Sequence, residues 1–149
     1  MIEVPGATHS SKRKVGLVLG AGGIRGCAHA GVIQVLHEAG VPIDLVVGAS
    51  VGSIFGLGMA AEAPTEHIVR AARDATPLDM FLFYAGRLRT DRRNLAARLL
   101  REAGEGKTFA DLPLPFAVMA TDMTTHQTVA IDHGPVLPAV EASIALPFI

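Results

Sequence analysis

Short apolar runs and longer stretches of helical periodicity alternate along the first part of this chain. Residues 15–19 and 45–47 are uncharged, apolar and bounded by charge or glycine, which predicts two buried strands. Between them, residues 26–39 carry apolar side chains at helical spacing and end before Gly40, a typical helix terminator. Strands that are apolar without alternation are usually buried on both faces, so this strand, helix and strand predict a parallel sheet covered by helices.

The rest of the chain continues this mixed pattern. Helical periodicity recurs in four later segments, residues 53–61, 65–74, 94–103 and 136–144. Two further strands, residues 116–120 and 128–131, flank a polar turn and predict a hairpin. The pattern therefore predicts one α/β domain over residues 14–149, with a mostly parallel central sheet, after a flexible tail over residues 1–13.

Two apolar stretches admit a second interpretation. Residues 45–61 carry no charge and space Gly48, Gly52 and Gly56 as in a membrane helix, but the run is short and rich in glycine, which favours a buried strand followed by a buried helix. Residues 79–84 hold the densest aromatic cluster of the chain. Core packing explains that cluster, and a lid or an acyl-chain contact is the functional alternative.

Composition narrows the class of protein. Half of the 149 residues are hydrophobic and the formal net charge is -1, which is typical of a globular protein and argues against nucleic acid as a partner. The single Cys27 excludes an internal disulfide and a cysteine zinc cluster, as expected in a reducing compartment such as the cytoplasm. The histidines lack metal-ligand spacing, so neither a metal nor another cofactor is predicted.

Candidate chemistry begins at residues 48–52, Gly-Ala-Ser-Val-Gly, between a predicted strand and a predicted helix. A serine on so sharp a turn has strained backbone angles and an exposed hydroxyl, and small residues two positions away let the strand and the helix approach each other. Gly48 and Gly52 meet that demand. Ser50 is therefore a candidate nucleophile, and the alternative is a serine that simply caps the helix.

A second glycine cluster, residues 20–26, follows the first strand and opens the first helix. Its free backbone N–H groups favour a negative charge, which can be a pyrophosphate, a phosphate or the oxyanion of acyl transfer. The dinucleotide pattern fails because Arg25 stands where the third glycine belongs, and no Lys-Ser/Thr pair completes a phosphate loop. An oxyanion needs only two adjacent free amides, which Gly22 and Gly23 supply.

Both clusters should meet at one edge of the sheet, because consecutive parallel strands end on the same side. Ser50 and the amides of Gly22 and Gly23 would then face one crevice. A hydroxyl beside preorganised donors is the minimum apparatus for ester hydrolysis through an acyl-enzyme, and one such donor typically contributes about 3 kcal/mol in the transition state.

These motifs closely resemble those of the patatin-like phospholipase family, including its bacterial members and the catalytic domain of neuropathy target esterase. The resemblance rests on residues 17–26, Leu-Val-Leu-Gly-Ala-Gly-Gly-Ile-Arg-Gly, and on residues 48–52. Further similar segments follow in the family's order: residues 28–32, 108–112, 120–122 and 139–147. The resemblance therefore extends from about Lys14 to the last residue.

The resemblance implies a three-layer fold and a cofactor-free lipid acyl hydrolase with a Ser-Asp dyad. Ser50 would be the nucleophile, Gly22 and Gly23 the oxyanion donors, and Arg25 a positioning cation. The supporting motif glycines would be Gly20, Gly26, Gly48 and Gly52. The implied partner is a lipid or acyl-ester substrate, which a cytoplasmic or peripherally membrane-bound enzyme would reach.

One family motif has no match. The general base of the family lies in an Asp-Gly-Gly or Asp-Gly-Ala motif after the Ala-Ser-x-Ala-x-Pro segment, and this chain ends at Ile149 without it. Asp122 and Asp132 are poor substitutes by position, and His29 offers a Ser-His alternative near the glycine loop. We therefore expect the C-terminal part of the fold to be incomplete and weigh two rivals, a catalytically silent lipid-binding remnant and a phosphate- or nucleotide-binding module.

Overall fold

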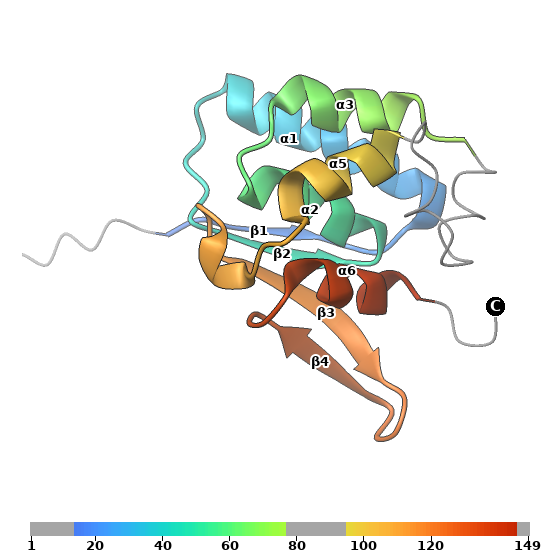
Figure 1. Cartoon of the computed structure of the whole chain (residues 1–149). Helices are drawn as coiled ribbons and strands as arrows, with labels where there is room; N and C mark the ends of the chain where they lie inside the picture. The colour runs from blue at the N-terminus through green and yellow to red at the C-terminus, as the bar shows by residue number, and fades with distance from the viewer. Residues whose placement is uncertain (1–13, 77–94, 146–149) are drawn as a thin grey trace, which may run out of the picture.

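The computed structural model of the chain describes residues 14–76 and 95–145. The predicted tail over residues 1–13 and the aromatic cluster over residues 79–84 lie outside the described residues. The described strands form one sheet in the order β1-β2-β3-β4, with the first three parallel and the last antiparallel (Figure 1). Their bounds are β1 Gly16–Leu19, β2 Leu45–Ala49, β3 Phe116–Asp122 and β4 Gln127–Ile131.

The described helices agree with the periodicity of the sequence to within two residues at most ends. They are α1 Ala28–Glu38, α2 Val51–Ala60, α3 Thr65–Arg73, α5 Leu95–Gly104 and α6 Val136–Ile144. Short 3₁₀ turns at Gly23–Cys27 and Phe109–Asp111 precede α1 and β3. Gly40 has a φ of 64°, so it ends α1 as predicted. The α/β class, the parallel unit and the hairpin are confirmed.

The prediction that the first strands are buried on both faces is wrong for the described part of the chain. Leu19 and Val46 are 2% and 0% exposed, whereas Val18 and Leu45, on the other face, are 72% and 40% exposed. The described helices pack together on the first face (Figure 1). An apolar strand that lacks alternation shows that both faces are suited to burial, and the described residues cover one of them.

Helix α2 is the centre of the core. Nine of its ten residues are buried, and Leu57 and Ala60 are fully so. Added β-carbons at Gly56 and Gly58 would lie 3.0 Å from the ring of Phe116 and 3.2 Å from Leu99, so both glycines let neighbours pack closely. The uncharged stretch over residues 45–61 is therefore strand β2 followed by a helix of the core, as the sequence pattern favoured over a membrane helix. Among residues 14–76 and 95–145, no helix is long and apolar enough to cross a bilayer.

The first turn of α2 lies against the end of β1. A β-carbon added to Gly52 would stand 2.1 Å from the carbonyl oxygen of Leu19 and 2.8 Å from that of Gly20. Backbone atoms of a paired strand cannot yield as a flexible side chain can. Glycine at this position is therefore what allows α2 to begin directly above the carboxyl end of β1.

We predict that Gly52→Ala lowers the free energy of unfolding by about 3 kcal/mol or more, because the new methyl group overlaps the backbone of β1. Gly31→Ala is the matched control: Gly31 lies in α1 and an added β-carbon meets nothing within 4 Å. That control should raise stability by roughly 0.5–1 kcal/mol through helix propensity. Chemical denaturation measures both, and equal changes in the two variants would contradict the packing argument.

Candidate active site

Ser50 occupies a strained turn between β2 and α2. Its backbone angles are φ 52° and ψ -126°, a combination that residues with a side chain seldom adopt and that typically costs about 1–3 kcal/mol. It stands at the N-cap position of α2, yet its side chain makes no capping hydrogen bond. The alternative of a simple capping serine is therefore not supported, and the strain presents a hydroxyl that the helix end does not use.

Contacts on the carbonyl side of Ser50 hold this turn. The backbone N–H and the hydroxyl of Ser53 both donate to the Ser50 carbonyl, at 2.8 and 2.5 Å. A β-carbon added to Gly48 would lie 2.5 Å from the Cα atom of Ser53. Gly48 and Gly52 thus satisfy the steric demand that the sequence pattern predicted: Gly48 packs against the first turn of α2, and Gly52 packs against the end of β1.

The N–H side of Ser50 is held by a residue far away in the sequence. The Ser50 N–H donates to the hydroxyl oxygen of Ser143 at 2.7 Å, and that hydroxyl donates to the carbonyl of Met119 at 2.6 Å. Ser143 belongs to α6 and lies 93 residues from Ser50. It lies within the Ala-Ser segment that resembles the family, but no periodicity or spacing in the sequence links it to Ser50.

The glycine loop after β1 lies beside this turn. In the parallel register Leu19 of β1 pairs with Gly48 of β2, so both strands end at the same edge. A β-carbon added to Gly26 would stand 2.1 Å from Cγ1 of Val51, the residue that follows Ser50. The loop and the serine turn are therefore in direct contact, as expected from two consecutive parallel strands.

Within the loop, the glycines differ in what they require. Gly23 has a φ of 55°, which favours glycine, and it begins the 3₁₀ turn. Gly22 has a φ of 176° and a ψ of 3°, and its carbonyl accepts from the N–H of Arg25 at 3.2 Å. A β-carbon on Gly20 would meet nothing within 4 Å. Close packing thus accounts for Gly26 and backbone angle for Gly23, while the side chain of Arg25 is exposed.

The side chain of His29 is hydrogen-bonded to the glycine loop and not to Ser50. Its Nε2 lies 2.8 Å from the carbonyl of Gly20, and because a carbonyl only accepts, this nitrogen is the donor. The hydrogen bond ties the first turn of α1 to the end of β1. The Ser-His alternative is therefore not supported by the arrangement of the described residues.

Neither aspartate considered as a base is engaged with Ser50. Asp122 lies three residues beyond Met119, about 10 Å further along β3 at about 3.3 Å per residue, and accepts from the N–H groups of Thr124 and Thr125 at 2.8 and 3.3 Å. These hydrogen bonds lower the pKa of the Asp122 carboxyl, and the bond from Thr124 has the largest effect. A lowered pKa weakens a carboxylate as a proton acceptor.

Asp132 lies at the opposite edge of the sheet. It follows β4, which runs antiparallel to β3, and shares a hollow with Leu45 at the beginning of β2. Its carboxylate contacts Nδ1 of His133 at 2.9 Å, and this hydrogen bond lowers its pKa. Gly134 follows with a φ of 78°, so this segment is a turn after a strand.

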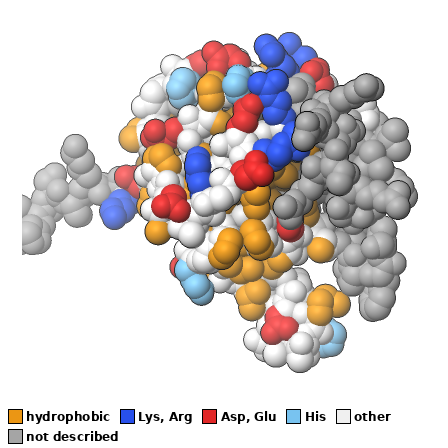
Figure 2. Space-filling model, viewed as in Figure 1, with side chains coloured by type: hydrophobic (Ala, Val, Ile, Leu, Met, Phe, Trp, Pro, Cys, Tyr) orange, Lys and Arg blue, Asp and Glu red, His pale blue; other side chains and the backbone are white. Residues whose placement is uncertain are grey.

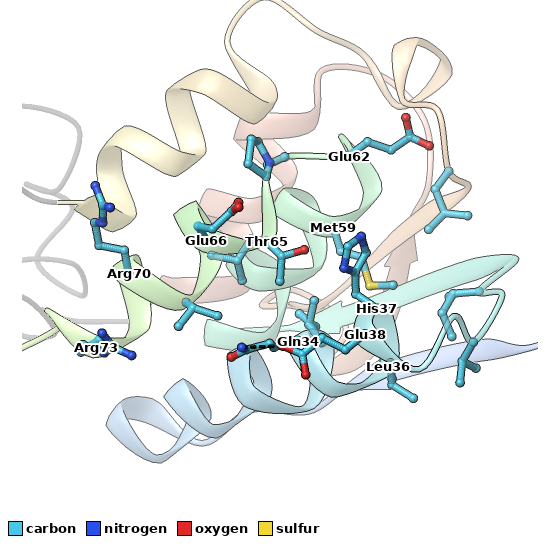
Figure 3. Close-up of a pocket in the computed structure, with 18 of the residues that line it drawn as sticks. Gln34, Leu36, His37, Glu38, Met59, Glu62, Thr65, Glu66, Arg70 and Arg73 are labelled. Atoms are coloured by element: carbon cyan, nitrogen blue, oxygen red, sulfur yellow. Dashed lines mark hydrogen bonds between the residues drawn. The ribbon is translucent and has the colours of Figure 1, made fainter.

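A large open groove, about 930 Å³ in volume, lies away from the serine. It runs between α1 and α3 and reaches Met59, nine residues into α2 from Ser50 or about 14 Å at 1.5 Å per residue. Figure 3 shows charged side chains of both signs around it, with Gln34 donating to Glu38 at 2.8 Å. Acidic and basic groups also gather on the α3 side of the surface (Figure 2). The groove contains neither Ser50 nor the glycine loop.

Comparison with known proteins gives consistent matches over nearly the whole chain. The family model for patatin-like phospholipase matches residues 17–149. An NTE family protein of Mycobacterium tuberculosis is 35% identical over 144 residues, which cover 93% of this chain and 39% of that protein. Human patatin-like phospholipase domain-containing protein 6 is 33% identical over 141 residues, 89% of this chain and 10% of that protein. The chain thus spans about two fifths of the bacterial relative.

A shorter match and two solved structures add to this result. Lysophospholipase NTE1 of Mycosarcoma maydis is 61% identical over 49 residues, 33% of this chain and 3% of that protein. VipD of Legionella pneumophila superposes with a TM-score of 0.63 at 16% identity, covering 90% of this chain and 42% of VipD. The type III effector ExoU gives 0.58 at 20% identity, covering 90% and 40%. The two structures confirm the fold, and the family match together with the relatives shows that this chain belongs to the patatin-like phospholipase family.

Proposed function

We propose that the chain carries the nucleophile half of a serine hydrolase that cleaves carboxylic ester bonds of phospholipids or other acyl esters. The observation that carries the proposal is the backbone of Ser50, strained at φ 52° and ψ -126° in a position where its hydroxyl does not cap α2. Strain of this kind persists only where the surrounding structure enforces it, and it concentrates at active sites. Residues 14–149 would form the corresponding part of the hydrolase domain.

The proposed reaction has two halves. The Ser50 oxygen attacks the ester carbonyl carbon while its proton passes to a base, and the tetrahedral intermediate collapses to an acyl-enzyme as the alcohol leaves with a proton. Water then attacks the acyl-enzyme, the fatty acid departs, and Ser50 regains its proton. The family resemblance implies an aspartate as the base, and we assign that role to neither Asp122 nor Asp132, since each is engaged elsewhere.

The negative charge of each tetrahedral intermediate would be stabilised by the backbone N–H groups of Gly22 and Gly23. Support comes from the contact between Gly26 and Val51, which sets the loop beside the serine turn. The N–H groups at the beginning of the 3₁₀ turn also carry the positive end of its dipole. Donors fixed in place before the reaction do not have to reorganise as the charge develops, so they favour the transition state over the substrate.

The family and the relatives of this chain support a lipid substrate. One relative is named a lysophospholipase, and the matching family is that of the patatin-like phospholipases. Such substrates are held in membranes or micelles, so we propose peripheral contact with a lipid surface during turnover. The exposed guanidinium of Arg25, on the glycine loop, is suited to orient an anionic head group near the proposed oxyanion site.

Replacing the proposed nucleophile gives the first functional test. We predict that a fluorophosphonate probe labels this chain on Ser50 and that Ser50→Ala abolishes labelling, because the only oxygen activated by the turn is removed. Intact mass and peptide mapping locate the adduct. Thr121→Ala, which removes an exposed hydroxyl from β3, is the control and should label as the wild type does.

The two rivals make different predictions for the same protein. A silent lipid-binding remnant would bind lipid vesicles without reacting with the probe. A phosphate-binding module would be stabilised against heat by inorganic phosphate or a nucleotide and would remain unlabelled. Absence of labelling in the wild type would therefore overturn the proposal that Ser50 is activated in this chain.

The oxyanion assignment can be tested through the backbone angle of Gly23. We predict that Gly23→Ala slows labelling of Ser50 on the order of 10²-fold, because a side chain disfavours φ 55° and the N–H group turns away from the developing charge. Gly16→Ala is the matched control, since Gly16 lies in β1 and an added β-carbon there meets nothing within 4 Å. Equal labelling rates in the two variants would exclude Gly23 as a donor.

A further inference from the structure

The hydrogen bond between Ser50 and Ser143 departs from the regular pairing of β2 with β3. The N–H of Val46 donates to the carbonyl of Pro115 at 2.9 Å, and the two strands stay in parallel register as far as the pair of Ala49 with Met119. Donors of a parallel ladder recur at every second residue. Regular pairing would therefore bring the N–H of Ser50 to the carbonyl of Met119.

The hydroxyl of Ser143 is inserted into that expected bond. It accepts from the Ser50 N–H at 2.7 Å and donates to the Met119 carbonyl at 2.6 Å, so it takes both places in the last rung of the ladder. Because its single proton points to Met119, a lone pair faces Ser50, and both hydrogen bonds have a defined direction. The backbone of Ser50 is thereby kept off β3 by the width of one oxygen atom.

Helix α6 holds this hydroxyl in place. Ser143 is the penultimate residue of α6, and its neighbours Val140 and Ile144 are 0% and 7% exposed within the core. Buried side chains in a close-packed interior fix the position of the helix backbone. A water molecule in the same place could make the same two hydrogen bonds but would lack this covalent anchor.

We propose that Ser143 is a positioning residue for Ser50. Its hydroxyl replaces the last hydrogen bond between β2 and β3 and so fixes the strained turn that presents the Ser50 side chain. Without it, the Ser50 N–H and the Met119 carbonyl are left to a mobile water, and the turn loses its fixed position. The proposal rests on the proposed function in that it treats Ser50 as the nucleophile, whereas the structural bridge exists independently of any reaction.

Three substitutions at one position test this role. Ser143→Ala removes the bridge, Ser143→Thr keeps the hydroxyl, and Ser143→Cys keeps the volume but weakens both hydrogen bonds. Thr108→Ala is the matched control, because it also removes a hydrogen-bonded hydroxyl, which donates to Asp111 at 2.7 Å, near the beginning of β3 at the opposite edge. Chemical denaturation identifies variants that are folded, and a folded Ser143→Cys replaces Ser143→Ala if the latter does not fold.

Two measurements on the full chain give the readouts. The first is the second-order rate of fluorophosphonate labelling at Ser50, which Ser143→Ala should lower by roughly 10- to 100-fold, as expected for a misplaced reacting group. The second is hydrogen exchange of the Ser50 amide by NMR, which should become about tenfold faster on loss of one net hydrogen bond. Ser143→Thr should restore both values, and Thr108→Ala should leave both at the level of the wild type.

Each outcome decides between the two proposals. Labelling and amide exchange unchanged in folded Ser143→Ala or Ser143→Cys would overturn the positioning role, as would an equal loss of labelling in Thr108→Ala. If the wild type is not labelled, the proposed function fails, and amide exchange alone decides whether Ser143 holds the turn. Faster exchange in Ser143→Ala with rescue by Ser143→Thr would then support the bridge, and unchanged exchange would exclude it.

Discussion

The contact between Gly52 and the carbonyl oxygen of Leu19 is the constraint on which the site depends. A β-carbon at Gly52 would stand 2.1 Å from that oxygen, so only a residue without a side chain lets α2 begin above the end of β1. This approach brings the serine turn at the end of β2 against the glycine loop that follows β1. Gly26 completes the contact, since a side chain there would overlap Val51. The relation between the serine turn and the glycine loop is thus set by backbone packing.

The energetic cost of the strained turn is offset by a rigid surrounding. Helix α2 lies in the centre of the core, with Leu57 fully buried, and Ser53 holds the Ser50 carbonyl from within that helix. Helix α6 supplies the remaining restraint through Ser143, which reaches the N–H side of the same residue. Helix α2, which directly follows Ser50, and helix α6, which is distant in sequence, therefore converge on one backbone position. That convergence is what a residue in a sparsely populated region of φ and ψ requires in order to persist.

Local patterns predicted most of the fold and the glycine and serine motifs, because each of these features is encoded within a few neighbouring residues. Helix α6 was predicted at its exact bounds, and the shared edge of Ser50 and the glycine loop followed from the rule for parallel strands. The hydrogen bond between Ser143 and Ser50 is not predictable from local patterns, because a contact between residues 93 positions apart leaves no periodic signal in the sequence. The exposure of Val18 was also missed, since hydrophobicity shows what can be buried and not what covers it.

The central claim is that the serine turn and the glycine loop form one acyl-transfer site. A crystal structure of the chain after reaction with a fluorophosphonate tests it most directly, because the phosphonyl oxygen mimics the oxyanion of the tetrahedral intermediate. The account predicts an adduct on the Ser50 oxygen, with the phosphonyl oxygen about 2.7–3.1 Å from the backbone nitrogens of Gly22 and Gly23. An adduct on another residue, or a phosphonyl oxygen directed away from the loop, would contradict it.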